Sequence, residues 1–174
     1  MRFLLLSLLT AATASAAIAP EKVENVRSLI RARNLPAAET AANALVAANP
    51  SEAEAHALLG NVQIGKGNAE AAVKAYEKAV ALAPADGDLQ RQLGDAYGFA
   101  AQKAGMFGMV GFAKKCRIAY EKAVELEPAN LNARNSLMTY YQQAPSIAGG
   151  GMDKAYAQAA EIKQLDAVRG RVAP

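Results

Sequence analysis

The sequence predicts an all-α protein built as a stack of about four helical hairpins, and two observations support this fold class. First, 52% of the 174 residues are hydrophobic, but only 6% are aromatic and none is Trp. Such a composition, rich in alanine, favours closely packed helices. Second, the phrases 77–84 (EKAVALAP) and 121–128 (EKAVELEP) are almost identical, and a third phrase ends at Pro50, 34 residues before Pro84. This spacing is typical of helical hairpins that bury their apolar faces by stacking on one another.

The first residues have the features of a secretory signal peptide. Arg2 is followed by the apolar run 3–9, and Ala14-Ser15-Ala16 supplies the small residues that a signal peptidase requires. The apolar run is shorter than the roughly 20 residues that span a bilayer as a helix, which argues against a membrane anchor. We therefore expect residues 1–16 to be a signal peptide, cleaved after Ala16, and the protein to be periplasmic or secreted.

The first predicted hairpin covers residues 20–50. Asn34-Leu35-Pro36 supplies the turn, and Ala38, Ala42 and Leu45 form one apolar face of a helix. This hairpin lacks the Leu-Gly pair and the aromatic residue that the later hairpins carry. We interpret it as a degenerate repeat that caps the N-terminal end of the stack.

The second hairpin, residues 51–84, carries a pattern of small, aromatic and turn-forming residues over both of its helices. The matching positions are Leu59, Gly60, Ala72, Tyr76, Ala79 and Pro84. This pattern resembles that of the tetratricopeptide repeat (TPR) family, although His56 stands where the family has Trp and Gln63 where it has Tyr. In such a repeat the glycine and alanines let two helices touch, the aromatic residue fills the space between them, and the proline breaks the chain.

The third and fourth hairpins, residues 85–128 and 129–167, continue the resemblance. The third matches at Leu93, Gly94, Tyr97, Tyr120, Ala123 and Pro128, with Cys116 at a position where the family has Ala, and the fourth matches at Leu137, Tyr141, Ala155 and Ala159. Pro84 and Pro128 are 44 residues apart, so we expect a ten-residue insertion between the two helices near 101–110. A shorter insertion is expected near 145–150. The TPR domain is thus predicted over 17–167, followed by a tail at 168–174.

The charge and the few reactive residues exclude several kinds of function. The formal net charge is only +3, which is too small to indicate nucleic acid binding. Cys116 and His56 are the only cysteine and histidine, so the sequence offers no disulfide and no cluster of metal ligands. Both are expected to be packing residues. No nucleophile or paired acidic motif stands out, and we expect neither enzymatic activity nor a cofactor or metal.

The resemblance implies a right-handed TPR superhelix, an α-solenoid, that acts as a scaffold. It also implies that the first helix of each repeat lines a concave groove that binds a protein or peptide segment. The positions that we expect to contact this segment are Asn61, Ile64, Arg91, Asp95, Phe99, Asn135, Thr139 and Gln142. Among them only Arg91 is basic, and Asp88 and Asp95 flank it. We therefore expect a neutral or weakly basic partner. The segments 113–116, 144–150 and 169–170 are also similar to those of a group of exported bacterial TPR proteins.

The insertion is the second candidate surface. Segment 103–115 is apolar in the middle and basic at both ends, and glycines separate its Met and Phe residues. Its candidate contact residues are Met106, Phe107, Met109, Phe112, Lys114 and Lys115. Such a segment suits a partner helix or an anionic membrane surface, so the alternative function is a peripheral membrane- or lipid-contacting protein. In the simpler interpretation, Phe107, Met109 and Phe112 fold back and cover the core of their own hairpin.

Overall fold

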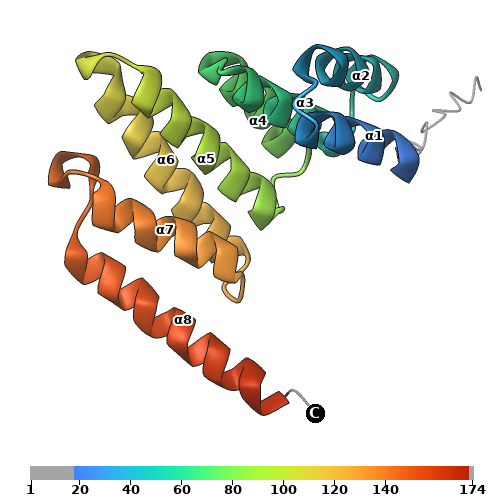
Figure 1. Ribbon diagram of the computed structural model, residues 1–174. Coiled ribbons are helices and arrows are strands. Elements are labelled where there is room, and N and C mark those ends of the chain that lie inside the picture. Colours follow the sequence, from blue (N-terminus) through green and yellow to red (C-terminus); the bar gives the residue numbers. More distant parts are fainter. Residues whose placement is uncertain (1–17, 173–174) are drawn as a thin grey trace, which may run out of the picture.

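The structure, a computed structural model, describes residues 18–172, without the side chains of 106, 107 and 169–172. The predicted signal peptide 1–16 lies outside the described residues. Residues 18–172 form eight α-helices, a short 3-10 helix and no strand. Paired along the chain, the helices are α1 (Pro20–Arg31) and α2 (Leu35–Ala48), α3 (Ala53–Lys66) and α4 (Ala69–Leu82), α5 (Gly87–Lys103) and α6 (Met106–Leu126), and α7 (Leu131–Gln143) and α8 (Met152–Val172). Figure 1 shows the four hairpins in a row.

The stack has an inner and an outer row of helices. Each helix packs on the next one along the chain, and in addition α3 contacts α1 and α5, and α5 contacts α7. Within residues 18–172 no such contacts join α2, α4, α6 and α8 to one another. We call the first helix of each hairpin an A helix and the second a B helix. Because the A helices lie closer together, they form the inner, concave side of the stack.

The apolar core is divided into two clusters. The smaller one joins α1, α2 and α3, and its fully buried side chains include Val26 and Val62. The larger one extends from α3 to α8 and contains four buried tyrosines among many alanines: Tyr76, Tyr97, Tyr120 and Tyr141. Small residues let the helices approach, and the tyrosine rings fill the space between them.

Two glycines show how closely the helices approach. A Cβ atom on Gly60 would lie 2.7 Å from the ring of Tyr76, and one on Gly94 would lie 2.5 Å from the ring of Tyr120. Only glycine fits at such positions, because any side chain would overlap the ring. The packing role predicted for both glycines follows from these distances.

The insertion in the third hairpin lengthens both helices and forms no long loop. Helix α5 has 17 residues where α3 has 14, and α6 has 21 where α4 has 14. All ten additional residues are therefore helical, and the turn at Ala104 and Gly105 is as short as the turn between α3 and α4. In the fourth hairpin the additional residues lie in the connection 144–151, which contains the 3-10 helix Ser146–Ala148. Helix α8 continues to Val172, so most of the segment predicted as a tail is helical.

His56 and Cys116 are both packing residues in the structure. His56 is 9% exposed and its Nε2 lies 3.0 Å from the carbonyl oxygen of Pro50. Arg134, at the equivalent position of the fourth hairpin, donates from Nε to the carbonyl oxygen of Pro128 at 2.6 Å. Each of these side chains ties the first turn of an A helix to the connection before it. Cys116 is buried in the larger cluster.

Candidate peptide-binding groove

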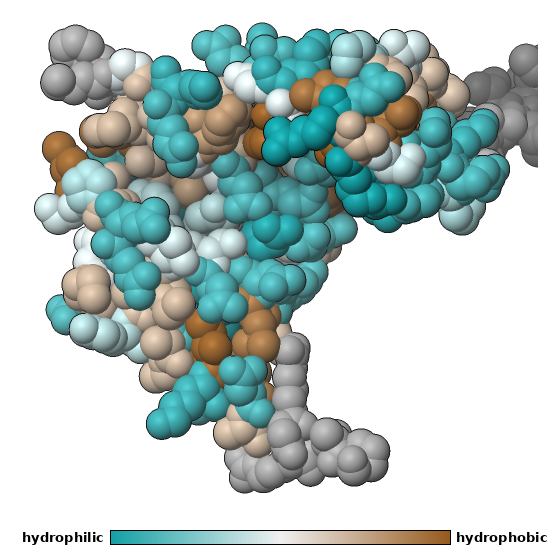
Figure 2. All heavy atoms as spheres, viewed as in Figure 1, coloured by the Kyte–Doolittle hydropathy of each residue, from teal (hydrophilic) through white to brown (hydrophobic). Residues whose placement is uncertain are grey.

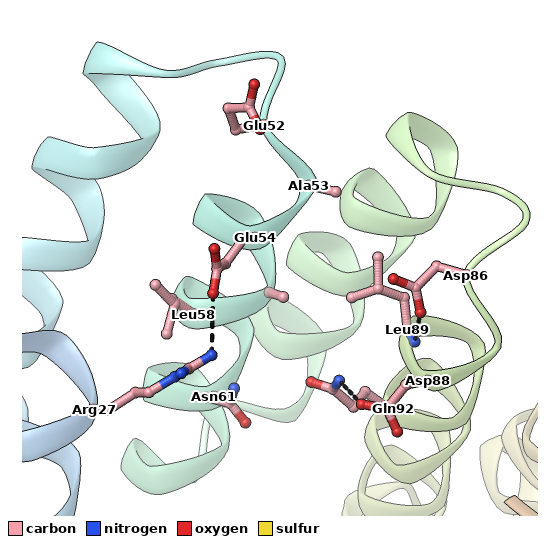
Figure 3. A pocket seen from close by; sticks show the side chains of 11 residues that line it. Arg27, Glu52, Ala53, Glu54, Leu58, Asn61, Asp86, Asp88, Leu89 and Gln92 are labelled. Carbon is pink, nitrogen blue, oxygen red and sulfur yellow. Dashed lines mark hydrogen bonds and ion pairs between the residues drawn. The ribbon is translucent and has the colours of Figure 1, made fainter. Parts of the chain in front are cut away.

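A pocket of about 400 Å³ opens between three A helices. Figure 3 shows side chains from α1, α3 and α5 pointing toward one another around it. Helix α3 contributes Glu54, Ala57, Leu58 and Asn61, and helix α5 contributes Asp88, Leu89 and Gln92. Because the A helices form the concave side, this pocket is part of the groove that the sequence predicts. We call it the first pocket.

The lining of the first pocket is acidic. Four carboxylates line it, from Glu52, Glu54, Asp86 and Asp88, and Arg27 is the only basic lining residue. The Arg27 guanidinium donates a 3.0 Å hydrogen bond to Glu54, so its charge is already balanced by one carboxylate. Asp86 accepts a hydrogen bond from the backbone N–H of Leu89 at the start of α5. The pocket therefore carries an excess of negative charge.

A second group of charges lies further along α5. The Arg91 guanidinium donates to Asp88 at 2.9 Å and to Asp95 at 2.7 Å. The hydroxyl of Tyr120 donates to the other oxygen of Asp95 at 2.6 Å. Burial raises the pKa of Asp95 above its usual value, in spite of the hydrogen bonds from Tyr120 and Arg91 that act in the opposite direction. Arg91 is thus held between two aspartates and is not a free cation for a partner.

A second pocket, of about 420 Å³, lies between α5 and α7 and has part of α6 as its floor. Its α5 residues are Asp95, Gly98 and Gln102, and its α7 residues include Asn135, Ser136 and Thr139. Asp88, Gln92, Asp95 and Gln102 follow one another at helical spacing, so one face of α5 passes from the first pocket to the second. The two pockets are therefore parts of one groove along the A helices.

The structure brings together some of the predicted contact residues and separates others. Asn61 lines the first pocket, while Asp95, Asn135 and Thr139 line the second. Ile64 and Phe99 are half-buried and pack against the larger core cluster, and Gln142 is exposed and lines neither pocket. Asn61 also has a structural partner, since it accepts a 2.8 Å hydrogen bond from the hydroxyl of Tyr76.

Sequence reasoning missed several groove residues that the structure reveals. They are mainly the long polar side chains of Arg27, Gln92, Gln102 and Gln143. Gln92 and Gln102 continue the helical spacing that starts at Asp88, so a strict count of this face of α5 would have found both. Arg27 could not be found in this way, because it lies on α1 in a hairpin that lacks the repeat pattern.

The lengthened part of the third hairpin covers its own core. Phe112 is half-buried against the larger core cluster, and its ring centroid lies 6.4 Å from that of Tyr97. The Lys115 ammonium lies 5.4 Å from the Tyr97 ring centroid and 5.9 Å from that of Phe112, and Lys114 is exposed. Met109 is 40% exposed. The side chains of Met106 and Phe107 lie outside the description. For Phe112 the simpler interpretation is correct, and the structure does not favour the membrane-contact alternative.

The surface and the side-chain clusters of the described residues give no support to a metal site or a membrane-spanning helix. Figure 2 shows hydrophobic residues in separate groups among hydrophilic ones on the face that it displays. No group of three or more His, Cys, Asp or Glu residues in the described part of the chain could hold a metal ion. None of the helices between residues 18 and 172 is both long enough and apolar enough to cross a bilayer.

Comparisons with known proteins agree with this architecture. Residues 23–97 match the family model described as Tetratricopeptide repeat. A crystal structure of MamA has a TM-score of 0.67 at 20% identity, covering 86% of this chain and 79% of that one. A structure of MamA from Desulfovibrio magneticus RS-1, residue 41 to the end, has a TM-score of 0.66 at 20% identity, with 87% and 76% covered.

A thermophilic TPR protein of Thermus thermophilus, TTC0263, has a TM-score of 0.68 at 20% identity, with 83% and 73% covered. No curated protein matches this sequence. At this level of identity the structures establish the fold alone. Together with the family match over residues 23–97, they show that the helical hairpins form a tetratricopeptide repeat fold. TPR folds in general are scaffolds for protein–protein interaction and not enzymes.

Proposed function

We propose that this protein is an exported scaffold whose groove of A helices binds an extended segment of another protein, and that this segment is neutral or basic. The observation that supports the proposal is the acidic lining of the first pocket, where Arg27 faces four carboxylates. The only basic residue among the predicted contact positions, Arg91, is engaged by Asp88 and Asp95. This negative charge would attract a basic segment and repel an acidic one.

The second pocket supplies groups that suit a peptide backbone. Asn135 and Thr139 are exposed, line this pocket and make no side-chain hydrogen bond to any residue in the described part of the chain. An asparagine amide can donate to a backbone carbonyl and accept from a backbone N–H at the same time. These side chains can therefore bind an extended segment in a sequence-tolerant way, while the carboxylates of the first pocket select for positive charge.

Charge reversal in the first pocket tests the groove. We expect the double variant Glu52→Lys, Glu54→Lys to lose the retention of a partner from an envelope extract on the immobilised protein. The matched control is Glu70→Lys, Glu125→Lys, because these carboxylates are exposed on the B helices α4 and α6. The control should retain the same partner. Equal retention by both double variants would show that the groove does not bind it.

Export rests on the signal peptide predicted at residues 1–16 and needs a separate test. Alkaline phosphatase lacking its own leader is active only after transport out of the cytoplasm, because its disulfides form there. We expect residues 1–20 fused to this enzyme to give activity, and the same fusion with Leu5→Arg and Leu6→Arg to give none, since charges interrupt the apolar run. An inactive unmodified fusion would contradict export and leave the groove proposal intact.

A further inference from the structure

An apolar pocket of about 220 Å³ lies beside the second pocket, toward the C-terminal end of α5. Its walls come from three helices: Ala101 on α5, Met109 and Ala113 on α6, and Tyr140 on α7. Ala144 and Pro145, at the start of the connection to α8, close one side. No charged side chain lines it. We call it the apolar pocket.

The apolar pocket exists because the chain departs from the 34-residue repeat in two places. Met109 lies in the lengthened first part of α6, and Ala101 lies at the lengthened end of α5. Pro145 belongs to the connection 144–151, the second place where the chain is longer than the repeat. The two insertions are far apart in the sequence, yet both contribute to this one pocket. A hairpin of ordinary length would lack the walls that Ala101, Met109 and Pro145 form.

The apolar pocket is continuous with the groove. It shares five lining residues with the second pocket: Gly98, Gln102, Cys116, Tyr140 and Gln143. Gln102 and Gln143 are exposed, so their amides stand at the boundary between the apolar and the polar pocket. A chain that lies along Asp95, Asn135 and Thr139 would thus pass the mouth of the apolar pocket.

The chemistry of the walls restricts the occupant to an uncharged, apolar group. Cys116 is only 3% exposed, and burial raises the pKa of its thiol to about 12, so it is neutral and forms an apolar part of the wall. Burying a charge here would cost free energy, because no opposite charge lines the pocket. Burial of an apolar side chain would be favourable.

We propose that the apolar pocket is a specificity subsite that takes one large apolar side chain, such as Leu, Met or Phe, of the segment bound in the groove. This inference rests on the function proposed above and adds a sequence requirement to it. The bound segment carries an apolar anchor beside the part that contacts Asn135 and Thr139, and its basic residues lie toward the first pocket. The acidic groove and the apolar pocket together then define a two-part recognition sequence.

Selection of random peptides tests this inference. Phage-displayed peptides of random sequence would be selected on the purified protein, and an enriched peptide would be measured by fluorescence anisotropy. We expect the enriched peptides to share one large apolar residue. Replacing this residue by Ala should weaken binding about tenfold, the usual effect of removing one buried apolar side chain.

Two variants of the protein test whether the apolar residue of the peptide binds in the apolar pocket. Met109→Glu places a charge at the pocket and is expected to fold normally, because Met109 is 40% exposed. Ala113→Phe fills the pocket. Both variants should bind the enriched peptide about tenfold more weakly than the unmodified protein does. Neither should change the binding of the Ala-substituted peptide. The matched control is Ile118→Glu, since Ile118 is 57% exposed on the same helix and does not line the pocket; it should bind normally.

The possible outcomes separate this inference from the proposed function. Peptides that lack a shared apolar residue, or that bind Met109→Glu as tightly as the unmodified protein, would overturn the subsite inference. The proposal that the groove binds a peptide segment would still stand. Binding of octanoic acid that Ala113→Phe abolishes, without any apolar preference among the peptides, would assign the pocket to a free small ligand and also overturn the subsite. If no peptide is enriched, both proposals are wrong. Circular dichroism shows whether each variant folds. If Ala113→Phe does not fold, the binding of the enriched peptide to Met109→Glu decides whether the subsite exists.

Discussion

The hydroxyl of Tyr120 on α6 donates a 2.6 Å hydrogen bond to the carboxylate of Asp95 on α5. The equivalent pair in the preceding hairpin is Tyr76 on α4 and Asn61 on α3, with a distance of 2.8 Å. In both hairpins the tyrosine ring fills the space beside a glycine of the A helix, and its hydroxyl reaches the groove side of that helix. The packing of each hairpin and the position of its groove side chain are therefore linked.

Removal of the Tyr120 hydroxyl tests this link. We expect Tyr120→Phe to lower the free energy of unfolding by about 2 kcal/mol, because the hydrogen bond to a charged acceptor is lost. Urea unfolding followed by circular dichroism measures the change. Tyr156→Phe is the control, since Tyr156 is 65% exposed, and it should change the free energy by less than about 0.5 kcal/mol. Similar small effects of both substitutions would show that the hydrogen bond adds no stability.

Alanine at two helical glycines should have opposite effects on stability. Gly94→Ala places a Cβ atom 2.5 Å from the Tyr120 ring, and we expect this overlap to destabilise the protein by about 1–3 kcal/mol. Gly111→Ala on α6 has nothing within 4 Å of the new Cβ atom, and the higher helix propensity of alanine should stabilise the protein by up to about 1 kcal/mol. Melting temperatures that rise for both variants would contradict the close approach of α5 and α6.

The raised pKa of Asp95 predicts a particular pH dependence. The folded state binds the proton of Asp95 at a pH where the unfolded state has released it, so this group stabilises the fold as the pH falls through its folded-state pKa. We compare the protein with Asp95→Asn by urea unfolding between about pH 7 and pH 4. The stability of the unmodified protein relative to the variant should increase toward pH 4.

Other carboxylates do not obscure this comparison. The hydrogen bonds from Lys66 and Gln63 lower the pKa of Glu39, which would make stability fall with decreasing pH. Glu39 is present in both proteins, so its contribution cancels in the difference. A difference that is constant or decreases toward pH 4 would show that the pKa of Asp95 is not raised.

The buried thiol of Cys116 should be unreactive in the folded protein. Its pKa of about 12 leaves very little thiolate near neutral pH, and its side chain is 3% exposed. We expect modification by a maleimide at pH 7.5 to be at least about 100-fold slower in buffer than in urea, as measured by mass spectrometry. Reaction at equal rates would show that the larger core cluster opens readily at α6.

The repeat pattern predicted the hairpins because the positions that define it are packing positions. Gly60, Gly94 and the two tyrosines that contact them lie where the pattern places them. A second recurring contact, a hydrogen bond between an A helix and the preceding B helix, was not predicted from the sequence. Gln63, Tyr97 and Tyr141 each donate from an A helix to a carboxylate on the preceding B helix, with partners Glu39, Glu77 and Glu121. The phrase YEKAV, at 76–80 and 120–124, already showed two of these glutamates directly after tyrosines.

The groove was harder to predict in detail than the hairpins. The A-helix positions that the resemblance implied include Asn61, Asp95, Asn135 and Thr139, which line the two pockets. Ile64 and Phe99 pack against the larger core cluster, since an apolar side chain beside a groove can turn into the core instead. The apolar pocket could not be predicted at all. Its walls come from α5, α6, α7 and the connection 144–151, and only the packing of the hairpins brings them together.

The division of the core into two clusters has a consequence for how the protein unfolds. The two clusters meet at α3, where Leu58 and Val62 belong to the smaller one and Ala57 to the larger. Hairpin stacks are held by contacts between neighbours, so α1 and α2 can detach while the remaining helices stay folded. Hydrogen exchange would then be fastest at the N-terminal hairpin. Since Arg27 lies on α1, such local opening would also remove one wall of the first pocket and expose the carboxylates of α3.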